Sequence, residues 1–329
     1  MSFSIVIRNI QKAELFVNMF QHVKVFSPSI NIMFETERMF VQSMDSSRVS
    51  VFEITIPAEW FDNYEVQRSV NLGINVAMLS SVLCTRDKSQ QIELVYNEDD
   101  DKLYLHFTRQ DVTVSELCAT AASLSAAAAI EDEDDTPPAA ASAKKPAKKA
   151  RGKKAAEITP DDDETVVTLP TAPSQYIDFD RHFELQLIDL ENEIMSIPDD
   201  IDYQAEFSIS AIKFANLIGQ LKLFGDTLNI KCSEEKIILA AVSTESGKME
   251  VFISISDLSE YAIEENQIVN LSFSLRLLQN ICLYAKLSRE IKIYILKGFP
   301  LRVDYNLIDG ATLVFYLAPK IGEDDEEDE

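Results

Sequence analysis

Two segments of the chain carry apolar residues at the spacing of an amphipathic helix. In residues 16–23 these side chains lie at positions i, i+3, i+4 and i+7, and residues 214–221 repeat that spacing. Such a stripe predicts a helix that packs one face on a sheet. A second pair of helices is predicted near residues 76–83 and 275–282, with Ser80 and Ser81 facing outward in the first of them.

Apolar and polar residues alternate in the stretches between these helices, which are rich in Val, Ile, Phe and Tyr. Alternation with this composition favours half-buried strands. The predicted strands include Arg48–Pro57, Gln91–Tyr96, Lys102–Phe107, Lys236–Ala241, Met249–Ser256 and Ile291–Ile295. A strand-dominated sheet with two helices on one face indicates an α+β fold.

The chain also matches itself in four segments, in the same order and at an offset of about 199 residues. The matches are Phe16–Phe26 with Phe214–Phe224, Phe40–Ile54 with Ile238–Ser254, Val70–Leu72 with Val269–Leu271, and Leu103–Leu105 with Leu301–Tyr305. In the second match, Val51 and Phe52 align with Val251 and Phe252. Four collinear matches predict a duplicated α+β module.

The stretch between the modules has a different composition. Residues 119–172 combine an Ala-rich run, acidic blocks, prolines and seven basic residues between Lys144 and Lys154. Low complexity and blocks of like charge bury too little apolar surface to offset chain entropy, so we expect this insert to be disordered. The predicted division is 1–118 for the N-terminal module, 119–172 for the insert, 173–186 for the end of that module, 187–199 for a connector, 200–321 for the C-terminal module and 322–329 for a disordered acidic tail.

The charge balance limits the possible partners. The chain has 55 acidic and 30 basic residues, a formal net charge of −25, which argues against a protein that coats nucleic acid non-specifically. The outward faces of the predicted helices nevertheless hold no acid and carry Lys12, Asn18 and His22 in one module and Lys213, Asn216 and Gln220 in the other. Two interpretations fit: a chance scarcity of acids on ordinary solvated faces, or faces that confront a polyanion.

Catalytic and metal-binding patterns are scarce. The three histidines lie outside any metal or protease motif, the four cysteines are far apart, and neither a Walker loop nor a GxSxG motif occurs. The acidic run 98–101 falls between two predicted strands and is typical of a hairpin turn. We therefore expect a non-enzyme without cofactor or metal. The polar N-terminus and the lack of a long apolar run predict a soluble, intracellular protein.

Four motifs resemble one known family. Ser43–Ser50 reads SMDSSRVS, Val70–Gly73 reads VNLG, Leu187–Pro198 begins LIDL and ends in Ile-Pro, and Tyr316–Ile321 reads YLAPKI before an acidic tail. They resemble proliferating cell nuclear antigen, the eukaryotic and archaeal sliding clamp. The resemblance implies two similar domains per chain and a homotrimeric ring, with helices lining a hole for double-stranded DNA and sheets outside. It further implies a processivity factor in DNA replication and repair, without membrane contact.

The resemblance implies two protein-binding surfaces. A pocket beneath the connector would hold a short peptide of DNA polymerase, the clamp loader or another partner. It would use Met44, Arg48, Val49, Val51, Met195, Ile197, Pro300, Tyr316, Ala318, Pro319 and Ile321. Alternatively, Met195 and Ile197 only pin the connector to the body. Subunits would join by pairing Arg181–Ile188 with Gly247–Ser254 of the next chain. The residues implied at this interface are Phe183, Leu185, Leu187, Ile218, Leu221, Met249 and Val251.

A third implied surface faces DNA. Its candidates are Lys12, Lys24, Arg86, Lys88, Lys213, Lys222, Arg276 and Lys286. Several family positions with basic residues are neutral here, namely Ser81, Cys84, Asn216, Gly219 and Leu283, so we expect weak DNA contact. The basic run 144–154 is a candidate nuclear import signal or a flexible arm for DNA. The family's modifiable lysine aligns with Glu234, beside Lys236, which puts that modification in doubt.

Three functions remain at this point. The first is a homotrimeric sliding clamp in the nucleus or, if virus-encoded, in a viral replication compartment. The second is a checkpoint-type or heteromeric clamp subunit, which the complete Tyr316–Ile321 motif disfavours. The third is an acidic histone or nucleic-acid chaperone, which the duplication disfavours.

Overall fold

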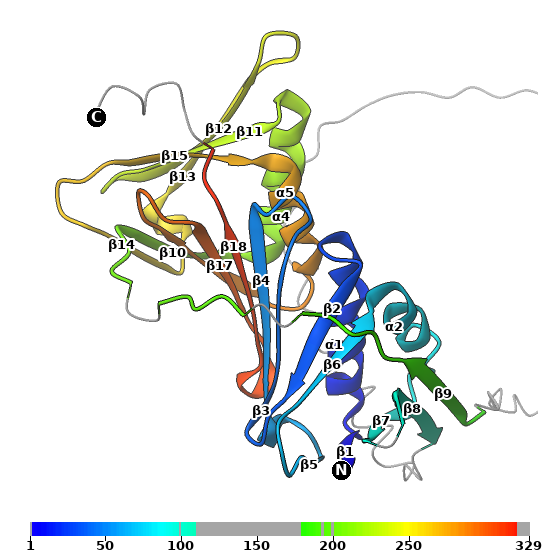
Figure 1. Cartoon of the computed structure of the whole chain (residues 1–329). Coiled ribbons are helices and arrows are strands. Elements are labelled where there is room, and N and C mark those ends of the chain that lie inside the picture. Colours follow the sequence, from blue (N-terminus) through cyan, green and yellow to red (C-terminus); the bar gives the residue numbers. More distant parts are fainter. Residues whose placement is uncertain (1, 99, 110–178, 192–193, 199–200, 321–329) are drawn as a thin grey trace, which may run out of the picture. The chain divides into compact units, whose positions relative to one another are not determined.

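The computed structural model describes residues 2–98, 100–109, 179–191, 194–198 and 201–320 (Figure 1). The insert 119–172, the basic run 144–154, Ile321 and the tail 322–329 lie outside the described residues, and so do the predictions made for them.

The first module contains nine strands and two α-helices among the described residues. Its elements are β1 (Ser2–Ile7), α1 (Ile10–Gln21), the 3₁₀ helix η1 (Val23–Val25), β2 (Ser29–Phe34), β3 (Arg38–Met44), β4 (Ser50–Pro57), η2 (Ala58–Trp60), β5 (Asn63–Glu65), β6 (Val70–Asn75), α2 (Val76–Leu83), β7 (Gln90–Asn97), β8 (Lys102–Arg109) and β9 (Arg181–Gln186).

The second module repeats this order. Its elements are β10 (Ala205–Ser210), α4 (Ala211–Leu221), η3 (Lys222–Phe224), β11 (Thr227–Cys232), β12 (Lys236–Ser243), β13 (Gly247–Ser254), η4 (Ile255–Asp257), β14 (Glu260–Ile263), β15 (Val269–Ser274), α5 (Leu275–Ile281), η5 (Cys282–Tyr284), β16 (Glu290–Ile295), β17 (Leu301–Asn306), η6 (Ile308–Gly310) and β18 (Thr312–Leu317).

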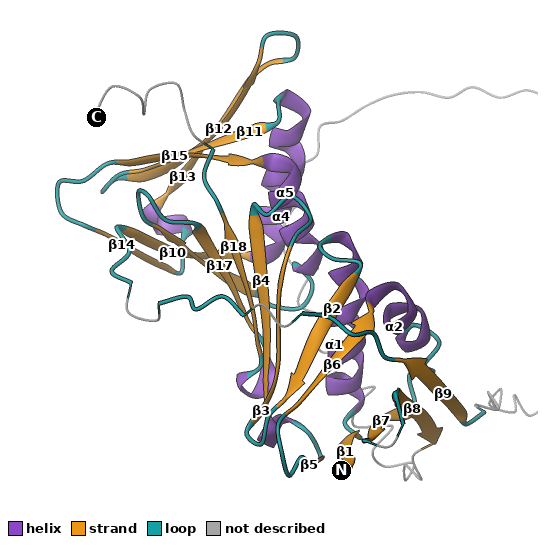
Figure 2. Ribbon diagram, in the orientation of Figure 1, coloured by secondary structure: helices purple, strands orange, loops and turns teal. Residues whose placement is uncertain are grey.

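The predicted helices are confirmed, and their local sequence explains where they begin. Asn9 precedes α1, and its side chain accepts hydrogen bonds from the backbone N–H groups of Gln11 and Lys12 at 2.9 and 3.2 Å. Asn75 caps α2 in the same way. Such caps satisfy N–H groups that have no partner within the helix. Figure 2 shows the helices α1, α2, α4 and α5 along one side of the sheet that contains β4 and β18.

The strands form three antiparallel sheets, and one of them joins the modules. A five-stranded sheet has the order β5-β1-β7-β8-β9, and a four-stranded sheet has the order β13-β12-β11-β15. The nine-stranded sheet, β14-β10-β16-β17-β18-β4-β3-β2-β6, takes strands from both modules. Its link is the pairing of β18 with β4, from Thr312 opposite Thr55 to Leu317 opposite Ser50 (Figure 1). We call this pairing the internal joint.

Each part of the nine-stranded sheet repeats one of the smaller sheets. The order β14-β10-β16-β17-β18 corresponds to β5-β1-β7-β8-β9, and the order β4-β3-β2-β6 corresponds to β13-β12-β11-β15. The α+β fold and the duplication predicted from the sequence are thus confirmed. Among the described strands, β9 and β13 are the counterparts of β18 and β4, but they do not pair with each other within the chain.

Strand registers show which residues correspond. Leu103 faces Leu185 as Leu301 faces Leu317, so β9 corresponds to β18. β4 and β13 both lead directly into a 3₁₀ helix capped by Pro57 and Ser254, respectively, so these two residues correspond. The predicted alignment of Val51 and Phe52 with Val251 and Phe252 is therefore wrong by three residues. That alignment would require the turn between β12 and β13 to be longer than the turn between β3 and β4, whereas it is shorter.

Candidate functional site

A pocket of about 370 Å³ lies where the connector crosses the internal joint. Nine of the eleven residues predicted for the partner pocket line it: Met44, Arg48, Val49, Val51, Met195, Ile197, Pro300, Tyr316 and Ala318. Pro319 is described but does not line this space, and Ile321 lies outside the described residues. The structure thus brings together residues from β3, β4, β18, the β16–β17 loop and the connector.

The prediction missed five lining residues. They are Ser196, Pro198, Ile201, Tyr203 and Phe299. Four of them belong to the connector or to the residues that follow it, and Phe299 precedes Pro300 in the loop before β17. The sequence signal that could have indicated them is the apolar or aromatic character of Ile201, Tyr203 and Phe299 beside residues already predicted.

The floor of the pocket comes from side chains that point outward from the internal joint. Val51, Val314 and Tyr316 form a small buried cluster, and Met44 and Ile197 pack against it. Tyr316 lies directly opposite Val51 in the β18–β4 pairing. Since successive strand residues face opposite sides, these residues cannot reach the main core, and they make an apolar surface outside it. An apolar recess of this kind suits an aromatic or aliphatic anchor.

Arg302 supports this floor from the neighbouring strand. Its guanidinium donates two hydrogen bonds of 2.8 Å to the carboxylate of Asp304, which is 6% exposed. The guanidinium carbon also lies 5.1 Å from the ring centre of Tyr294 and 5.9 Å from that of Tyr316. Bidentate pairing and stacking on rings hold a guanidinium in one orientation. Arg302 therefore limits the movement of the Tyr316 ring at the pocket floor.

One rim of the pocket is a turn organised by Asp45. Its buried carboxylate accepts backbone hydrogen bonds from Ser47, Val49 and Ser50, and the hydroxyl of Ser47 donates a further one. Burial works toward a higher pKa for Asp45, but these hydrogen bonds outweigh it and hold the pKa below its usual value. Arg48 adopts a positive φ of 57° in this turn. The carboxylate thus fixes a backbone that carries two pocket residues, Arg48 and Val49.

The connector is fastened across the same region by side chains of the first module. Gln42 accepts a hydrogen bond from the backbone N–H of Met195 at 2.6 Å and donates one to its carbonyl at 2.9 Å. Asn31 donates to the carbonyl of Glu191 at 3.0 Å. A second cavity of about 460 Å³ lies under this part of the connector and shares Met44, Arg48, Val51 and Met195 with the pocket. Met195 therefore both pins the connector and lines the pocket.

The predicted DNA-facing residues divide into free and engaged side chains. Lys24, Lys213, Arg276 and Lys286 are exposed and make no ion pair within the described residues. Lys88 is exposed and lies 3.8 Å from Glu14, a weak contact. These five side chains come from η1, the ends of the helices, and the loops that follow α2 and η5.

The other three candidates are engaged in contacts within the chain. Lys12 donates to the carbonyl of Trp60 at 2.8 Å and pairs with Asp309 at 2.6 Å. Arg86 donates to the carbonyls of Asp87, Lys88 and Gln90, and its burial lowers its pKa. Lys222 pairs with Asp226, four residues ahead. A cation neutralised or surrounded by carbonyl oxygens attracts phosphate less than a free one.

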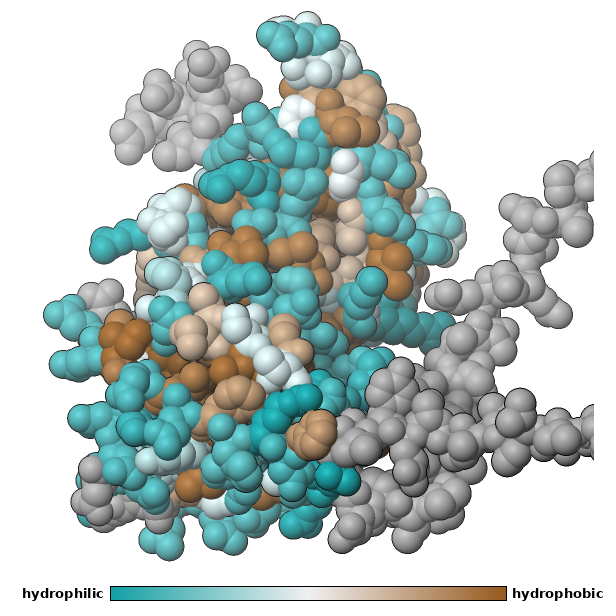
Figure 3. Space-filling model, turned by 90° about the vertical axis from the view of Figure 1, so that its right-hand side faces the viewer, coloured by the Kyte–Doolittle hydropathy of each residue, from teal (hydrophilic) through white to brown (hydrophobic). Residues whose placement is uncertain are grey.

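The helical side is also less uniform than the sequence indicated. Glu14 is an acid on α1 with a side chain 46% exposed. Ser80 is buried and donates to the carbonyl of Gln21, so the prediction that it faces outward is wrong. Apolar residues such as Met78, Ile212 and Leu223 are exposed. Figure 3 shows the side at the right of Figure 1 as mainly hydrophilic, with apolar patches between.

Both strands implied in subunit pairing lie at sheet edges. β9 ends the five-stranded sheet and β13 ends the four-stranded sheet, so each has one unpaired backbone edge among the described residues. Phe183, Met249 and Val251 are half-buried and pack only partly on the core, as expected for positions that a further strand could cover.

Other residues implied at the interface are not available there. Leu185, Ile218 and Leu221 are 4%, 0% and 0% exposed within the single chain. Their helix or strand faces the chain's own core, so we treat Ile218 and Leu221 as core residues rather than as an apolar seam. Leu187 is half-buried, and its N–H donates to the carbonyl of Asp101 at 3.1 Å. Two residues that follow Leu221 in the sequence offer apolar surface instead. Leu223 is 72% exposed, and Phe224 is half-buried.

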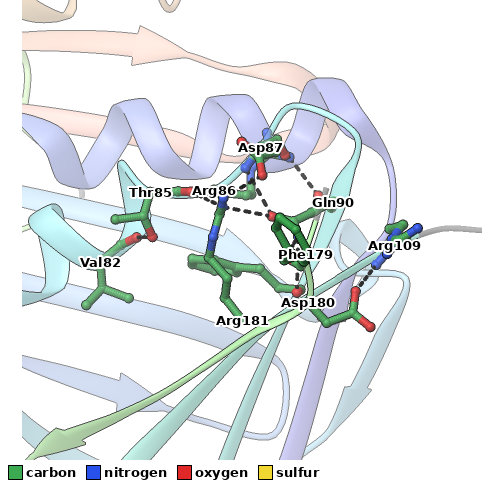
Figure 4. A network of polar contacts seen from close by, with 10 residues as sticks. Val82, Thr85, Arg86, Asp87, Gln90, Arg109, Phe179, Asp180 and Arg181 are labelled. Carbon is green, nitrogen blue, oxygen red and sulfur yellow. Dashed lines mark hydrogen bonds and ion pairs between the residues drawn. The ribbon is translucent and has the colours of Figure 1, made fainter. Parts of the chain in front are cut away.

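A polar network fixes the start of β9, where the chain returns from the insert (Figure 4). The buried side chain of Gln90 donates to the carbonyl of Phe179 at 2.7 Å and accepts from the N–H of Asp87 at 3.1 Å. Arg181 pairs with Asp87 at 2.8 Å and donates to the carbonyl of Thr85. We call Asp87, Gln90 and Arg181 the β9 clasp. It ties the edge strand to the loop after α2.

Neither a metal cluster nor a membrane span occurs in the part of the chain that the structure describes. No group of three or more His, Cys, Asp or Glu side chains is arranged to hold a metal there. No described helix is long and apolar enough to cross a membrane. β7 and β8, the strands on either side of the predicted acidic turn, pair as an antiparallel hairpin, and Asp99 of that turn lies outside the described residues.

Comparison with known proteins matches both modules. The family described as proliferating cell nuclear antigen, N-terminal domain, matches residues 6–120, and the corresponding C-terminal domain matches residues 196–320. The proliferating cell nuclear antigen of Chaetomium thermophilum is 22% identical over 290 residues, covering 87% of this chain and 86% of that protein.

Proposed function

The chain belongs to the proliferating cell nuclear antigen family of sliding clamps, and from this premise we propose that it forms a homotrimeric ring around duplex DNA. The ring would tether DNA polymerase and other replication and repair proteins. Its action requires no cofactor and no catalytic residue, because encirclement alone keeps it on DNA. We place it in the nucleus or in a viral replication compartment.

The observation that carries this proposal is the relation between the internal joint and the two free edges. Within the described residues, each chain contains one nine-stranded sheet across the internal joint, and its five- and four-stranded sheets correspond to the two parts of a second such sheet. Contact between β9 of one copy and β13 of the next would complete the second sheet. Such a contact is heterologous, and heterologous contacts that close produce rings. A trimer would contain six modules. They would be connected alternately by the internal joint within each chain and by the β9–β13 contact between chains.

The helical side supports contact with DNA through the phosphate backbone. Five exposed cations remain for this purpose: Lys24, Lys88, Lys213, Arg276 and Lys286. In a chain with net charge −25, they favour phosphate on this side, whereas acids elsewhere repel it. Backbone contacts carry no sequence information, so a ring held this way can slide. The small number of free cations supports the expectation of weak contact.

The pocket supports capture of peptide segments from partner proteins. An aromatic or aliphatic anchor would enter the apolar space over Tyr316 and Val51, while the connector covers it from the other side. Any partner that carries a peptide with such an anchor fits this surface.

Assembly and topology test the proposal together. The full chain should sediment at about three times 37.1 kDa at micromolar concentration. Rings assembled by concentrating dilute protein with a nicked plasmid should remain bound in high salt and leave when the plasmid is linearised. A monomer at all concentrations, or equal retention on circular and linear DNA, would contradict the proposal. A stable monomer would instead favour a heteromeric clamp subunit or a chaperone.

The DNA-facing side can be tested with matched charge changes. Replacing Lys213 and Arg276 by Gln should lower retention at low salt about tenfold and reduce its salt dependence. Lys231→Gln with Lys297→Gln removes two exposed charges from a strand and a loop and serves as the control. Equal losses in both variants would show that only net charge matters.

A further inference from the structure

One face of the four-stranded sheet carries apolar side chains on the side turned away from the core. Ile238, Ala240 and Val242 alternate along β12 on this side, and Phe252 lies opposite Ile238 on β13. Val242 and Phe252 are 55% and 60% exposed. Because alternate residues of a strand share a face, these side chains form one apolar strip, and such a strip is typical of a surface that another segment covers. We call this surface the β12 face.

The equivalent face of the first module is covered by the connector. The backbone N–H of Ile188 donates to the carbonyl of Gly73 on β6 at 2.8 Å, where the connector enters this face. Asn31 on β2 and Gln42 on β3 then hold the connector through hydrogen bonds to its backbone. Ile197 packs on the pocket floor, part of which belongs to β4. The connector thus crosses β6, β2, β3 and β4 in the order in which these strands lie in the sheet.

The residues before the acidic tail enter the second module at the same point. Lys320 corresponds to Ile188, from the registers of β9 and β18. Ser272 corresponds to Gly73, from the registers of β6 and β15. The backbone N–H of Lys320 donates to the carbonyl of Ser272 at 2.7 Å. The chain therefore meets the edge strand β15 as the connector meets β6.

An unused hydrogen-bond donor lies on the next strand of this path. Asn229 on β11 faces Ser272, as Asn31 faces Gly73, so the two asparagines correspond. The side-chain oxygen of Asn229 accepts from the hydroxyl of Ser272 at 2.6 Å. Its amide NH₂ group makes no hydrogen bond within the described residues, whereas that of Asn31 donates to a carbonyl of the connector. Asn229 can therefore hold a backbone carbonyl in the same way.

The charges of the β12 face suit an acidic segment. The strand positions on this side, all of them described, hold three lysines and a single acid. The acid, Glu250, pairs with Lys248 at 2.7 Å. Lys231 and Lys236 are exposed and make no ion pair within the described residues. In a chain with net charge −25 this is a local excess of positive charge, whereas residues 323–329 are all Asp or Glu.

We propose that the acidic tail crosses the β12 face as the connector crosses the first module, from β15 over β11 and β12 to β13. Glu323 is three residues beyond Lys320 and so takes the place of Glu191 in the connector. Its backbone carbonyl would accept a hydrogen bond from Asn229. All the groups involved belong to one chain, so the proposal does not depend on the ring.

The same count places the rest of the tail. Met195 is four residues beyond Glu191 in the connector and is held by β3. Glu327 would lie over the equivalent strand, β12, beside Ala240. The backbone of the tail would then cover the apolar strip, and its carboxylates would approach the two lysines that make no ion pair. Because the tail is joined directly to the sheet, it has a high effective concentration there and competes well with a segment of another protein.

Cysteine labelling tests whether the tail covers this face. In a Cys84→Ser, Cys118→Ser background, Val242→Cys should react with a neutral maleimide about fivefold faster when the seven acids 323–329 are replaced by Gln, because charge attracts the tail to the lysines. Ile212→Cys on α4 is the control, since Ile212 is 51% exposed and Val242 is 55% exposed. Its rate should be the same with either tail. Equal rates at Val242→Cys would overturn the proposal.

Disulfide trapping tests the path of the tail. In the same background, Ala240→Cys with Glu327→Cys should form an intrachain disulfide at least tenfold faster than Ala240→Cys with Glu323→Cys, because the second pair would be separated by a strand. Equal rates, or a preference for the second pair, would overturn this path. An interchain product would assign the tail to a second copy and also contradict the proposal. A ring that assembles while both experiments fail would refute only this inference.

Discussion

The strands of the internal joint, β18 and β4, and their counterparts at the free edges, β9 and β13, occupy the same places in their modules but carry different side chains on their outward faces. At the internal joint these positions hold Val51, Val314 and Tyr316, which make an apolar floor beneath the connector. The equivalent positions on β13 and β9 hold Lys248, His182 and Glu184, which are exposed. The difference teaches that equivalent strands can have the same place in the fold while only one pair, β18 with β4, presents an apolar surface on its outward face.

The turns that lead into β4 and β13 also differ. Asp45 holds its turn with three backbone hydrogen bonds and one from Ser47. The equivalent residue, Ser243, accepts two longer ones, from Glu245 at 3.2 Å and Ser246 at 3.4 Å. The rim of the pocket is therefore more firmly held than the hairpin that joins β12 to β13. Four predictions examine this contrast.

The largest effect is expected from Tyr316→Ala. Removing a large ring from the centre of an apolar pocket should weaken binding of a labelled aromatic-anchor peptide about 100-fold, as measured by fluorescence anisotropy. Ring assembly should remain unchanged, because Tyr316 is at the internal joint. Tyr261→Ala is the control, since this half-buried ring lies on β14 of the same sheet but does not line the pocket. Equal losses would mean that sheet stability, not the pocket, was changed.

The next effect concerns the β9 clasp. Gln90→Leu keeps the size of the side chain but removes its hydrogen bonds to Phe179 and Asp87. It should raise the ring dissociation constant and the amide exchange rates in β9 about tenfold, without altering peptide binding.

Gln91→Leu is the matched control for the clasp. The side chain of Gln91 donates to the hydroxyl of Thr108 on β8 at 2.8 Å rather than to the start of β9. If both variants raise the amide exchange rates of β9 equally, the β9 clasp has no special role in holding the edge strand.

A smaller effect, about fivefold on peptide affinity, is expected for Asp45→Asn, because an amide cannot accept all the hydrogen bonds of the carboxylate. The pKa of Asp45 is lowered in the folded state, so its contribution to stability is complete above the ordinary value of 3.8. It is lost as the pH falls below that value. In acid-unfolding experiments, the free energy of unfolding of the wild type should therefore approach that of the variant as the pH falls below 3.8. A constant difference down to about pH 2 would contradict the assignment.

The smallest expected effect is a two- to threefold change with pH in the amide exchange rates of β9. Burial and the charge of His182 lower the pKa of His106, against the opposing effect of Glu93. Because the folded state favours neutral His106, stability is complete above the ordinary pKa of 6.5 and declines as the pH falls below it. Amide exchange in β9, corrected for intrinsic pH dependence, should therefore accelerate between about pH 7 and 5.5.

Charges around the histidine pair define the control for this response. Glu93, Tyr104, Lys102 and Glu184 lie on the same face or beside it. His106→Gln should abolish the response if the pair causes it, and persistence in that variant would assign it to one of these neighbours. The internal joint, where the equivalent position is Asp304, should show no such change.

Residue patterns predicted much of the fold because they report local periodicity and repetition. The helical stripes, the duplicated order of elements and the acidic hairpin turn are all local features. The pocket was predicted in nearly the same detail, since Met44–Val51 and Tyr316–Ala318 belong to motifs resembling a known family. Residues beyond those motifs, such as Tyr203 and Phe299, were missed because their contribution depends on where the connector passes.

The sequence by itself determined that two similar modules exist, which segments form helices and strands, and that the chain carries excess negative charge. Only the tertiary structure decided that Lys12, Arg86 and Lys222 are engaged, that Ile218 and Leu221 lie in the core, and which of the described strands remain unpaired. The physical reason is that charge type and apolar character are properties of single residues. Availability for binding depends on which distant groups already occupy the same side chain or strand edge.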